Sequence, residues 1–290
     1  MKRLRLLIII FSAVVIVIYA INRVQEAMTS DYVAPVITAD YDAIQSSVAV
    51  TDQDLLTGMT ATDNLDGDVS DTLFVVSKSK FILRGTRRIG YAAFDKNNNV
   101  ATYTRTLTYT DYVSPHFSLS LPMCFLDGNT NQDFLQNVSC HDCLDGDITS
   151  QVRITFGDTV GISDSVSSRK VNLQVTNSAG DNATLELDAL IKDYNSYYEQ
   201  APALKEYLIY TPAGTKPTYS SLVYGVLSGD RTKAFSETSF DPYSDVSIQD
   251  SNVDYYTPGT YTVSFQLSRL LKDGTRERLG TTDLIVVVEG

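Results

Sequence analysis

Hydrophobic and polar residues alternate along three stretches of the chain, at 85–109, 167–191 and 259–288. The corresponding apolar positions are Ile89, Val171 and Val263, then Tyr91, Leu173 and Phe265, then Ala93, Val175 and Leu267. A period of two is typical of a strand with one buried face. A cluster of Asn, Asp, Lys or Gly residues follows each alternating run, and such residues favour hairpin turns. Each stretch therefore predicts a β-hairpin.

These hairpins close a longer repeat. Asp-Tyr pairs begin at Asp31, Asp111 and Asp193, and they lie about 80 residues apart. Short strands, frequent turn signals and no helical periodicity beyond the N-terminal segment predict a mainly β fold of tandem β-sandwiches. The predicted modules are 34–110, 111–192 and a more divergent 193–290.

The N-terminus has a different pattern. Residues 6–21 are mostly apolar and uncharged, and Lys2, Arg3 and Arg5 precede them. A run of this length is close to what a membrane-spanning helix needs. A cleaved signal peptide is the alternative, but bulky Ile18 does not suit the position before a cleavage site after Ala20. We therefore predict a transmembrane signal anchor.

The prediction divides this end into a cytoplasmic tail at 1–5, an anchor at 6–22 and a linker at 23–33. Positive charge before the span places the N-terminus in the cytoplasm. The protein would then be a single-pass protein of the cell membrane with its bulk outside the cell. All 35 acidic residues and 20 of the 23 basic ones follow the span, which gives that part a formal charge of −15. This charge argues against nucleic acid as a partner.

An acidic turn occurs twice, as "ATDNLDGDVS" at 61–70 and "CHDCLDGDITS" at 140–150. Its oxygen-bearing side chains could bind calcium, which takes six to eight oxygen ligands. The candidate ligands are Asp63, Asn64, Asp66, Asp68 and Asp95 in the first module, and Asp142, Asp145 and Asp147 in the second. The alternative is a structural turn, in which these carboxylates accept hydrogen bonds from the backbone. We favour the turn and predict no other cofactor.

Cysteine and tyrosine are unevenly distributed. Cys124, Cys140 and Cys143 are the only cysteines, so Cys124 could pair with either of the others, or all could stay reduced. The third module holds 11 of the 18 tyrosines, and tyrosine suits recognition surfaces. The pairs Tyr197-Tyr198 and Tyr255-Tyr256 are the candidate contact residues. No motif of a hydrolase, phosphate-binding loop or metalloprotease is present, so we predict no catalytic residue and no enzyme.

The order of these motifs resembles the bacterial surface immunoglobulin-like domains, which occur in tandem on Gram-positive surface proteins. The matching residues are Pro35, 62–70, Gly85-Thr86 and 95–99 in the first module, and Pro115, 142–149 and 177–182 in the second. The third module keeps the segment 258–263 but lacks the Asp-Gly-Asp turn. The resemblance implies immunoglobulin-like sandwiches of about seven strands and a surface location.

The predicted function is a non-enzymatic, membrane-anchored extracellular spacer, scaffold or adhesin that contacts a protein or glycan through its third module. One alternative is a carbohydrate-binding protein for cell-wall or host glycan. Another is a structural subunit of a cell-envelope assembly. An enzyme without a recognisable motif stays a further possibility, because carboxylate chemistry cannot be located without geometry.

Overall fold

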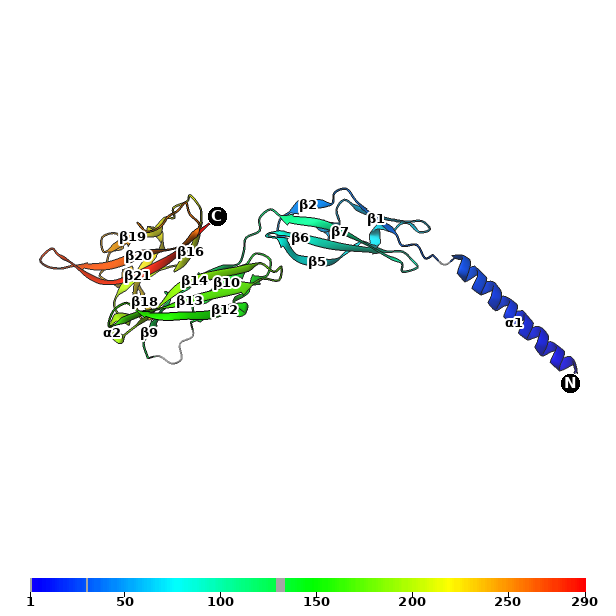
Figure 1. Cartoon of the computed structure of the whole chain (residues 1–290), viewed down its shortest axis with the longest axis horizontal. Coiled ribbons are helices and arrows are strands. Elements are labelled where there is room, and N and C mark those ends of the chain that lie inside the picture. Colours follow the sequence, from blue (N-terminus) through cyan, green and yellow to red (C-terminus); the bar gives the residue numbers. More distant parts are fainter. Residues whose placement is uncertain (1, 30, 129–133) are drawn as a thin grey trace. The chain divides into compact units, whose positions relative to one another are not determined.

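The computed structural model describes residues 2–29, 31–128 and 134–290 of the chain (Figure 1). These residues belong to two compact units, Met1–Tyr112 and Val113–Gly290. The fold is mainly β, with tandem immunoglobulin-like sandwiches after one N-terminal helix. This confirms the predicted fold class.

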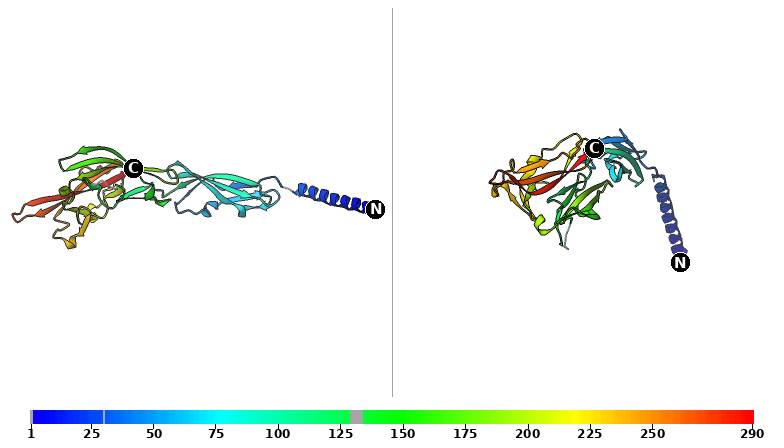
Figure 2. Two further views of the ribbon diagram at one scale, coloured as in Figure 1. Left: turned by 90° about the horizontal axis from the view of Figure 1, so that it is seen from below. Right: turned by 60° about the vertical axis from the view of Figure 1, so that its left-hand side comes forward.

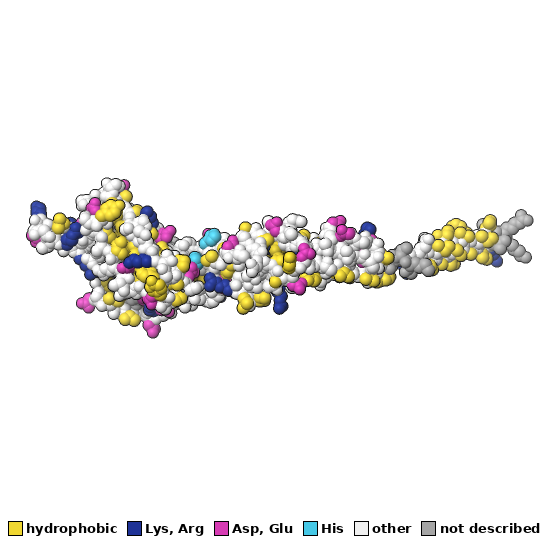
Figure 3. Space-filling view, turned by 90° about the horizontal axis from the view of Figure 1, so that it is seen from above, with side chains coloured by type: hydrophobic (Ala, Val, Ile, Leu, Met, Phe, Trp, Pro, Cys, Tyr) yellow, Lys and Arg dark blue, Asp and Glu magenta, His cyan; other side chains and the backbone are white. Residues whose placement is uncertain are grey.

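The N-terminal helix α1 runs from Lys2 to Thr29. Its segment Leu7–Gln25 has a mean hydropathy of 2.4 and is exposed throughout, and Figure 3 shows apolar side chains over its visible surface. A helix that is apolar all round cannot be stable in water unless something covers it. Its length and composition suit a membrane anchor or a signal sequence.

The first sandwich has two sheets. One has the order β1-β3-β4 and the other the order β2-β7-β6-β5, in which β2 runs parallel to the last strand β7. The bounds are β1 Val36–Ala39, β2 Ala43–Ser46, β3 Met59–Asp63, β4 Gly67–Asp68, β5 Phe74–Leu83, β6 Thr86–Phe94 and β7 Val100–Tyr109.

The same strand order recurs in the second sandwich, as β8-β10-β11 and β9-β14-β13-β12, with β9 parallel to β14. The bounds are β8 His116–Leu119, β9 Cys124–Leu126, β10 Val138–Asp142, β11 Gly146–Asp147, β12 Arg153–Gly161, β13 Val166–Thr176 and β14 Asn182–Lys192.

It recurs again in the third sandwich, as β15-β17-β18 and β16-β21-β20-β19, with β16 parallel to β21. The third sandwich therefore shares the topology of the others although its sequence has diverged most. Its long β20–β21 hairpin protrudes from the sandwich (Figure 2). The bounds are β15 Ala201–Leu204, β16 Leu208–Pro212, β17 Val223–Ser228, β18 Arg231–Ala234, β19 Val246–Gln249, β20 Gly259–Leu270 and β21 Arg276–Glu289.

Short helical turns connect some of these strands. A helix of one turn, α2, links the second and third sandwiches, and Asp193 caps its first turn by accepting a hydrogen bond from the Ser196 N–H at 2.8 Å. The turns are α2 Tyr194–Tyr197 and the 3₁₀ turns Asp54–Leu56, Ser70–Thr72, Thr149–Gln151, Tyr219–Leu222 and Phe235–Glu237.

The alternating side chains of the two long central strands form one side of each core, and buried side chains of the short sheet lie opposite them. All nine apolar positions aligned in the sequence are buried, with at most 2 % of their surface exposed. The predicted hairpins with one buried face are therefore confirmed. Arg105 also points into the first core, where it donates to the backbone carbonyls of Tyr41, at 2.8 Å, and Thr57, at 3.2 Å. These bonds compensate for burying its charge.

The outer strands of the long sheets are irregular. Register shifts interrupt β5 between Val75 and Ser77 and between Lys78 and Leu83, and they interrupt β12 between Phe156 and Thr159. In the short sheets of the first two sandwiches, one edge strand is β4 or β11, and each of these strands has only two residues. These edges therefore offer little regular backbone for further pairing.

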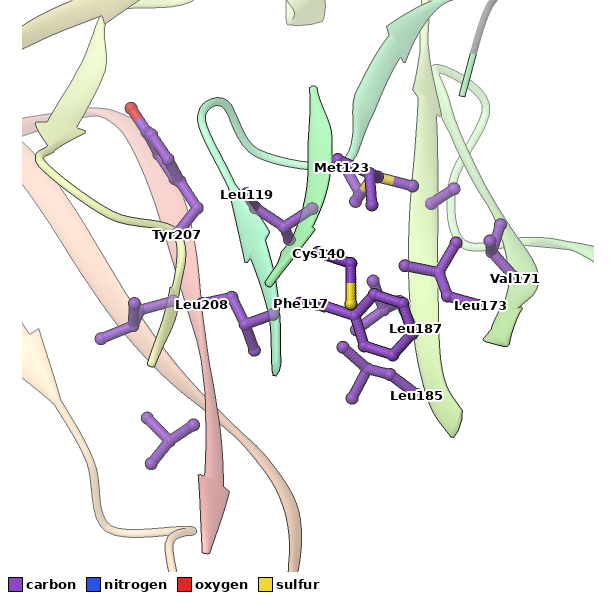
Figure 4. Close-up of a cluster of buried hydrophobic side chains, with 14 of the residues drawn as sticks. Phe117, Leu119, Met123, Cys140, Val171, Leu173, Leu185, Leu187, Tyr207 and Leu208 are labelled. Atoms are coloured by element: carbon purple, nitrogen blue, oxygen red, sulfur yellow. The ribbon is translucent and has the colours of Figure 1, made fainter. Parts of the chain in front are cut away.

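The second and third sandwiches share one buried apolar cluster within the second unit. Figure 4 shows Tyr207 and Leu208 of the third sandwich on one side of Leu119 and Phe117, and Leu173 on the other. The Tyr207 N–H donates to the Leu119 carbonyl at 3.3 Å. The junction at 192–193 thus joins two sandwiches that pack as one body.

Further contacts reinforce this packing. The Phe117 N–H donates to the Tyr210 hydroxyl at 3.0 Å, and burial raises the pKa of Tyr210 to about 12. The His116 ring stacks on the Tyr210 ring with centroids 3.8 Å apart, and its Nε2 lies 2.9 Å from the Glu289 carboxylate.

Leu119→Ala tests the shared core. The change removes a side chain that is 3 % exposed and packs against both sandwiches, so we expect the free energy of unfolding of the second unit to fall by about 2–5 kcal/mol. Circular dichroism and calorimetry of the full chain in detergent should show both sandwiches of that unit still unfolding together. Two separate transitions for those sandwiches would contradict a shared core.

Candidate functional site

The acidic turn of the first sandwich holds its backbone through its own carboxylates. Asp63 ends β3, and its Oδ1 accepts hydrogen bonds from the N–H groups of Leu65 and Asp66, both at 2.9 Å. Asp68 Oδ1 accepts from the Ser70 N–H at 2.9 Å. The N–H groups of Asp66 and Leu65 lower the pKa of Asp63, and the hydroxyl and N–H of Ser70 lower that of Asp68. These contacts are those of a structural turn.

A second contact ties this turn to the one after β6. Asp66 accepts from the Lys96 N–H and forms an ion pair with Lys96 Nζ, each at 2.9 Å. The bonds lower the pKa of Asp66 and raise that of Lys96. Asn64 is exposed to solvent.

Two of the predicted calcium ligands come together, and a third residue joins them. Asp63 and Asp95 lie with Asp31, each offering one carboxylate oxygen, and these three oxygens are within 4.8 Å of one another. All three residues are buried. Asp66 and Asp68 are not part of this cluster. In the sequence, Asp31 was notable only as the first residue of a repeated Asp-Tyr pair. Its distance along the chain from the acidic turn gave no sign that it would lie beside Asp63.

The second sandwich repeats the turn with one difference in chemistry. Asp142 Oδ1 accepts from the N–H groups of Leu144 and Asp145, both at 2.9 Å. Its Oδ2 accepts from the Asn177 amide at 3.0 Å. Asn177 occupies the position that corresponds to Asp95. Both oxygens of Asp142 are therefore satisfied by protein groups.

The remaining carboxylates of this turn also bind protein groups. Asp145 accepts from the Ser178 N–H and hydroxyl, both at 2.6 Å. Asp147 accepts from the Thr149 N–H at 2.9 Å, and the hydroxyl and N–H of Thr149 lower its pKa. The second turn thus has the contacts of a structural corner.

The described residues, which include all three cysteines, contain no disulfide. Cys124 lies on β9 and Cys140 on β10, which belong to opposite sheets. Cys140 packs in the core (Figure 4), and burial raises its pKa to about 11. Cys143 Sγ donates to the Val113 carbonyl at 3.1 Å. Neither pairing considered from the sequence, Cys124 with Cys140 or with Cys143, is formed here.

The four candidate tyrosines have different surroundings. Tyr256 is 81 % exposed, whereas Tyr255 is half-buried and its hydroxyl contacts Tyr219 at 2.7 Å and Asp250 at 3.1 Å. Burial and these two contacts raise the pKa of Tyr255. Tyr255 therefore belongs to the sandwich more than to its surface.

Tyr197 and Tyr198 line a groove in the second unit. The groove has a volume of about 720 Å³, and its walls come from both the second and the third sandwich. The two rings meet edge to face with centroids 5.1 Å apart. Lys170 on another wall forms ion pairs with Glu186 at 3.3 Å and Asp188 at 3.1 Å. Sequence reasoning missed this groove because it depends on how two modules pack.

Comparison with known proteins does not place the chain in a family, because no family model matches it. An uncharacterized 81.3 kDa protein of Acholeplasma phage L2 is 24 % identical over 158 residues, which cover 52 % of this chain and 21 % of that protein. The chain therefore spans about a fifth of the length of this curated relative.

Similar solved structures include the protocadherin γB4 extracellular domain, at 11 % identity over 88 % of this chain and 49 % of that one, with a TM-score of 0.20. Another comprises the CBM51-2 domain in complex with GlcNAc and the INT domains of Clostridium perfringens ZmpB, at 15 % identity over 88 % and 41 %, with a TM-score of 0.22. Human CDH23 EC21-23 covers 84 % and 97 % at 15 % identity, with a TM-score of 0.21. Scores this low carry no argument about the function of this chain.

Asp142→Ala tests the structural role of the second turn. Two backbone N–H groups and the Asn177 amide lose their acceptor, so the free energy of unfolding of the second unit should fall by about 1–3 kcal/mol. Thermal unfolding followed by circular dichroism measures the change. The exposed Asp158, changed to Ala, is the control and should stay within about 0.5 kcal/mol of the wild type. Equal stability of the two variants would show that the turn does not depend on Asp142.

Proposed function

We propose that this chain is a non-enzymatic extracellular scaffold or adhesin, anchored in a membrane by α1. The observation that carries the proposal is the seven-strand sandwich built three times in one chain behind an exposed apolar helix. Repeated rigid modules extend a chain while exposing many loops, and this suits proteins that span a distance or hold a partner. The charge of the part after α1 also fits a solvated surface protein.

The chemistry of the reactive side chains supports a non-enzymatic role. His116 stacks on Tyr210 and pairs with Glu289, so its ring has a packing partner on one face and a carboxylate at its edge. Cys140 is buried with a raised pKa, which disfavours the thiolate needed for nucleophilic attack. Both groups therefore have structural surroundings.

A carbohydrate-binding protein is the second candidate, and the groove of the second unit favours it. Tyr197 and Tyr198 offer aromatic rings, and Thr260, Thr262 and Asp283 offer hydroxyl or carboxylate groups along the same groove. A sugar presents both apolar C–H faces and hydroxyls, so it suits walls of mixed character. The volume is in the range of small-molecule sites.

Membrane fractionation tests the anchor. The full chain expressed in a bacterium should sediment with membranes and resist salt extraction, whereas a version beginning at residue 31 without α1 should be soluble. Protease added to intact cells or protoplasts should digest the sandwiches. Recovery of a soluble mature protein whose N-terminus lies near residue 20–30 would show a cleaved signal sequence and overturn anchoring.

Tyr198→Ala tests the groove as a glycan site. Loss of ring stacking should weaken binding to purified cell-wall glycan by about five- to tenfold, measured as the dissociation constant in a pull-down titration. The matched control is Tyr243→Ala, because Tyr243 is 89 % exposed and lies outside the groove. No saturable binding by the wild type, or equal loss in both variants, would leave the scaffold function and remove the glycan site.

A further inference from the structure

Three carboxylates come together at the end of β3 in the first sandwich without a cationic side chain among them. Asp31 and Asp63 are each 8 % exposed and Asp95 is 2 % exposed. One oxygen from each lies within 4.8 Å of the others. Like charges this close, with little water to screen them, repel one another. A bound cation would relieve this repulsion.

The hydrogen bonds of the cluster leave two oxygens without a donor. Asp31 Oδ1 accepts from the Val33 N–H at 2.9 Å, and Asp63 Oδ1 accepts from the turn described above. Asp95 accepts from the N–H and side-chain amide of Asn99, at 2.8 and 2.7 Å. Asp31 Oδ2 and Asp63 Oδ2 are buried and have no hydrogen-bond partner. A buried acceptor without a donor is unfavourable, and a metal ion would satisfy both at once.

In the second sandwich, protein donors satisfy both oxygens of the corresponding carboxylate, Asp142. There the Asn177 amide donates to Asp142 Oδ2 at 3.0 Å, whereas the corresponding Asp63 Oδ2 faces no donor. The backbone geometry matches, because the Asp181 N–H donates to Asn177 Oδ1 at 2.9 Å, as the Asn99 N–H does to Asp95. The carboxylate and the amide exchange positions between the two corners, since Asp95 and Asn99 correspond to Asn177 and Asp181. As a result an amide faces Asp142 in the second corner, whereas a carboxylate faces Asp63 in the first.

The third member of the cluster also differs between the modules. Asp111, the repeat marker that corresponds to Asp31, uses its carboxylate elsewhere in the first unit. It accepts from the Ser47 hydroxyl at 2.7 Å and from the Val48 N–H at 2.8 Å. Of the first two modules, the first therefore brings three carboxylates together at these positions and the second does not, among the residues that the structure describes.

We propose that Asp31, Asp63 and Asp95 bind one calcium ion. All donors are oxygens, which excludes a preference for zinc or copper. Calcium–oxygen distances of about 2.4 Å allow two ligands of one ion to lie up to about 4.8 Å apart. The three carboxylate oxygens lie within that limit of one another. Magnesium needs a tighter octahedron and retains several waters, which a buried cluster accommodates less well.

The ion would tie the segment that follows α1 to the first sandwich. Asp31 precedes β1, and its carbonyl already accepts from the Asn99 side-chain amide at 3.0 Å. Binding through Asp31 adds a charged link at the same point. Calcium would then determine how firmly the segment between α1 and β1 is held on the first sandwich. This inference does not depend on what the groove of the second unit binds.

The test uses the full chain in detergent, stripped of metal with a chelator and titrated with calcium chloride. We expect one ion per chain with a dissociation constant of about 10⁻⁶–10⁻⁴ M by calorimetry, and a higher unfolding temperature for the first unit. No heat and no thermal shift at millimolar calcium would overturn the proposal. An equal thermal shift with the same concentration of magnesium chloride would overturn the choice of calcium.

Asp95→Asn copies the amide of the second sandwich and should weaken calcium binding on the order of 100-fold. Asp66→Asn is the matched control, since Asp66 pairs with Lys96 outside the cluster, and it should keep wild-type calcium affinity. Loss of binding in Asp66→Asn but not in Asp95→Asn would place the ion in the turn and overturn the assignment. If Asp95→Asn does not fold, Asp31→Asn, before the first strand, serves as the second variant with the same expected loss of binding.

Discussion

The crossing of the chain from one sheet to the other, directly after the first strand, is the constraint on which every sandwich depends. In each module the first strand pairs with the third, and only three or four residues later the second strand pairs in parallel with the seventh. Such a link spans about 10–13 Å at the rise of an extended chain. This is close to the distance of about 10 Å between packed sheets. The crossing therefore holds the sheets together and limits the core to one layer of interdigitating side chains.

In the third sandwich the same crossing also makes the contact with its neighbour. Tyr207 lies in this link, and its N–H donates to the Leu119 carbonyl while its own carbonyl accepts from the Ile285 N–H at 3.0 Å. Its hydroxyl accepts from the Leu204 N–H at 3.2 Å, and burial raises its pKa to about 12. Tyr207 thus bonds to β21 within its own sandwich and to Leu119 of the second sandwich. This contact helps to hold the two sandwiches in one compact unit.

Much of the fold could be predicted from the sequence because a strand with one buried face has an apolar side chain at every second position. Ile89, Val171 and Val263 show this, since each begins a buried row at the same place in its module. The burial of Arg105 could not be predicted. Its position in the alternating pattern faces the core, but a charged side chain is usually at the surface. It is tolerated there through bonds to backbone carbonyls that only the folded loops provide.

The candidate site was less accessible to sequence reasoning for a similar reason. Asp63 and Asp95 were recognisable as oxygen donors near turns, but Asp31 is far from both along the chain and approaches them only when β1 pairs with β3. The same turn motif in the second module has different surroundings, because Asn177 stands where Asp95 does and Asp111 forms its hydrogen bonds elsewhere. A motif therefore predicted the corner, whereas its chemistry depended on a residue outside the motif.

The irregular outer strands affect how readily neighbouring sandwiches could exchange strands while the chain folds. Three sandwiches of one topology in a single polypeptide are present near one another at high effective concentration, which favours the exchange of strands between neighbours. Edges of two residues, and strands interrupted at Val75–Leu83 and Phe156–Thr159, offer no long template for an incoming strand. The first two repeats can therefore keep a common architecture while offering little surface for domain swapping.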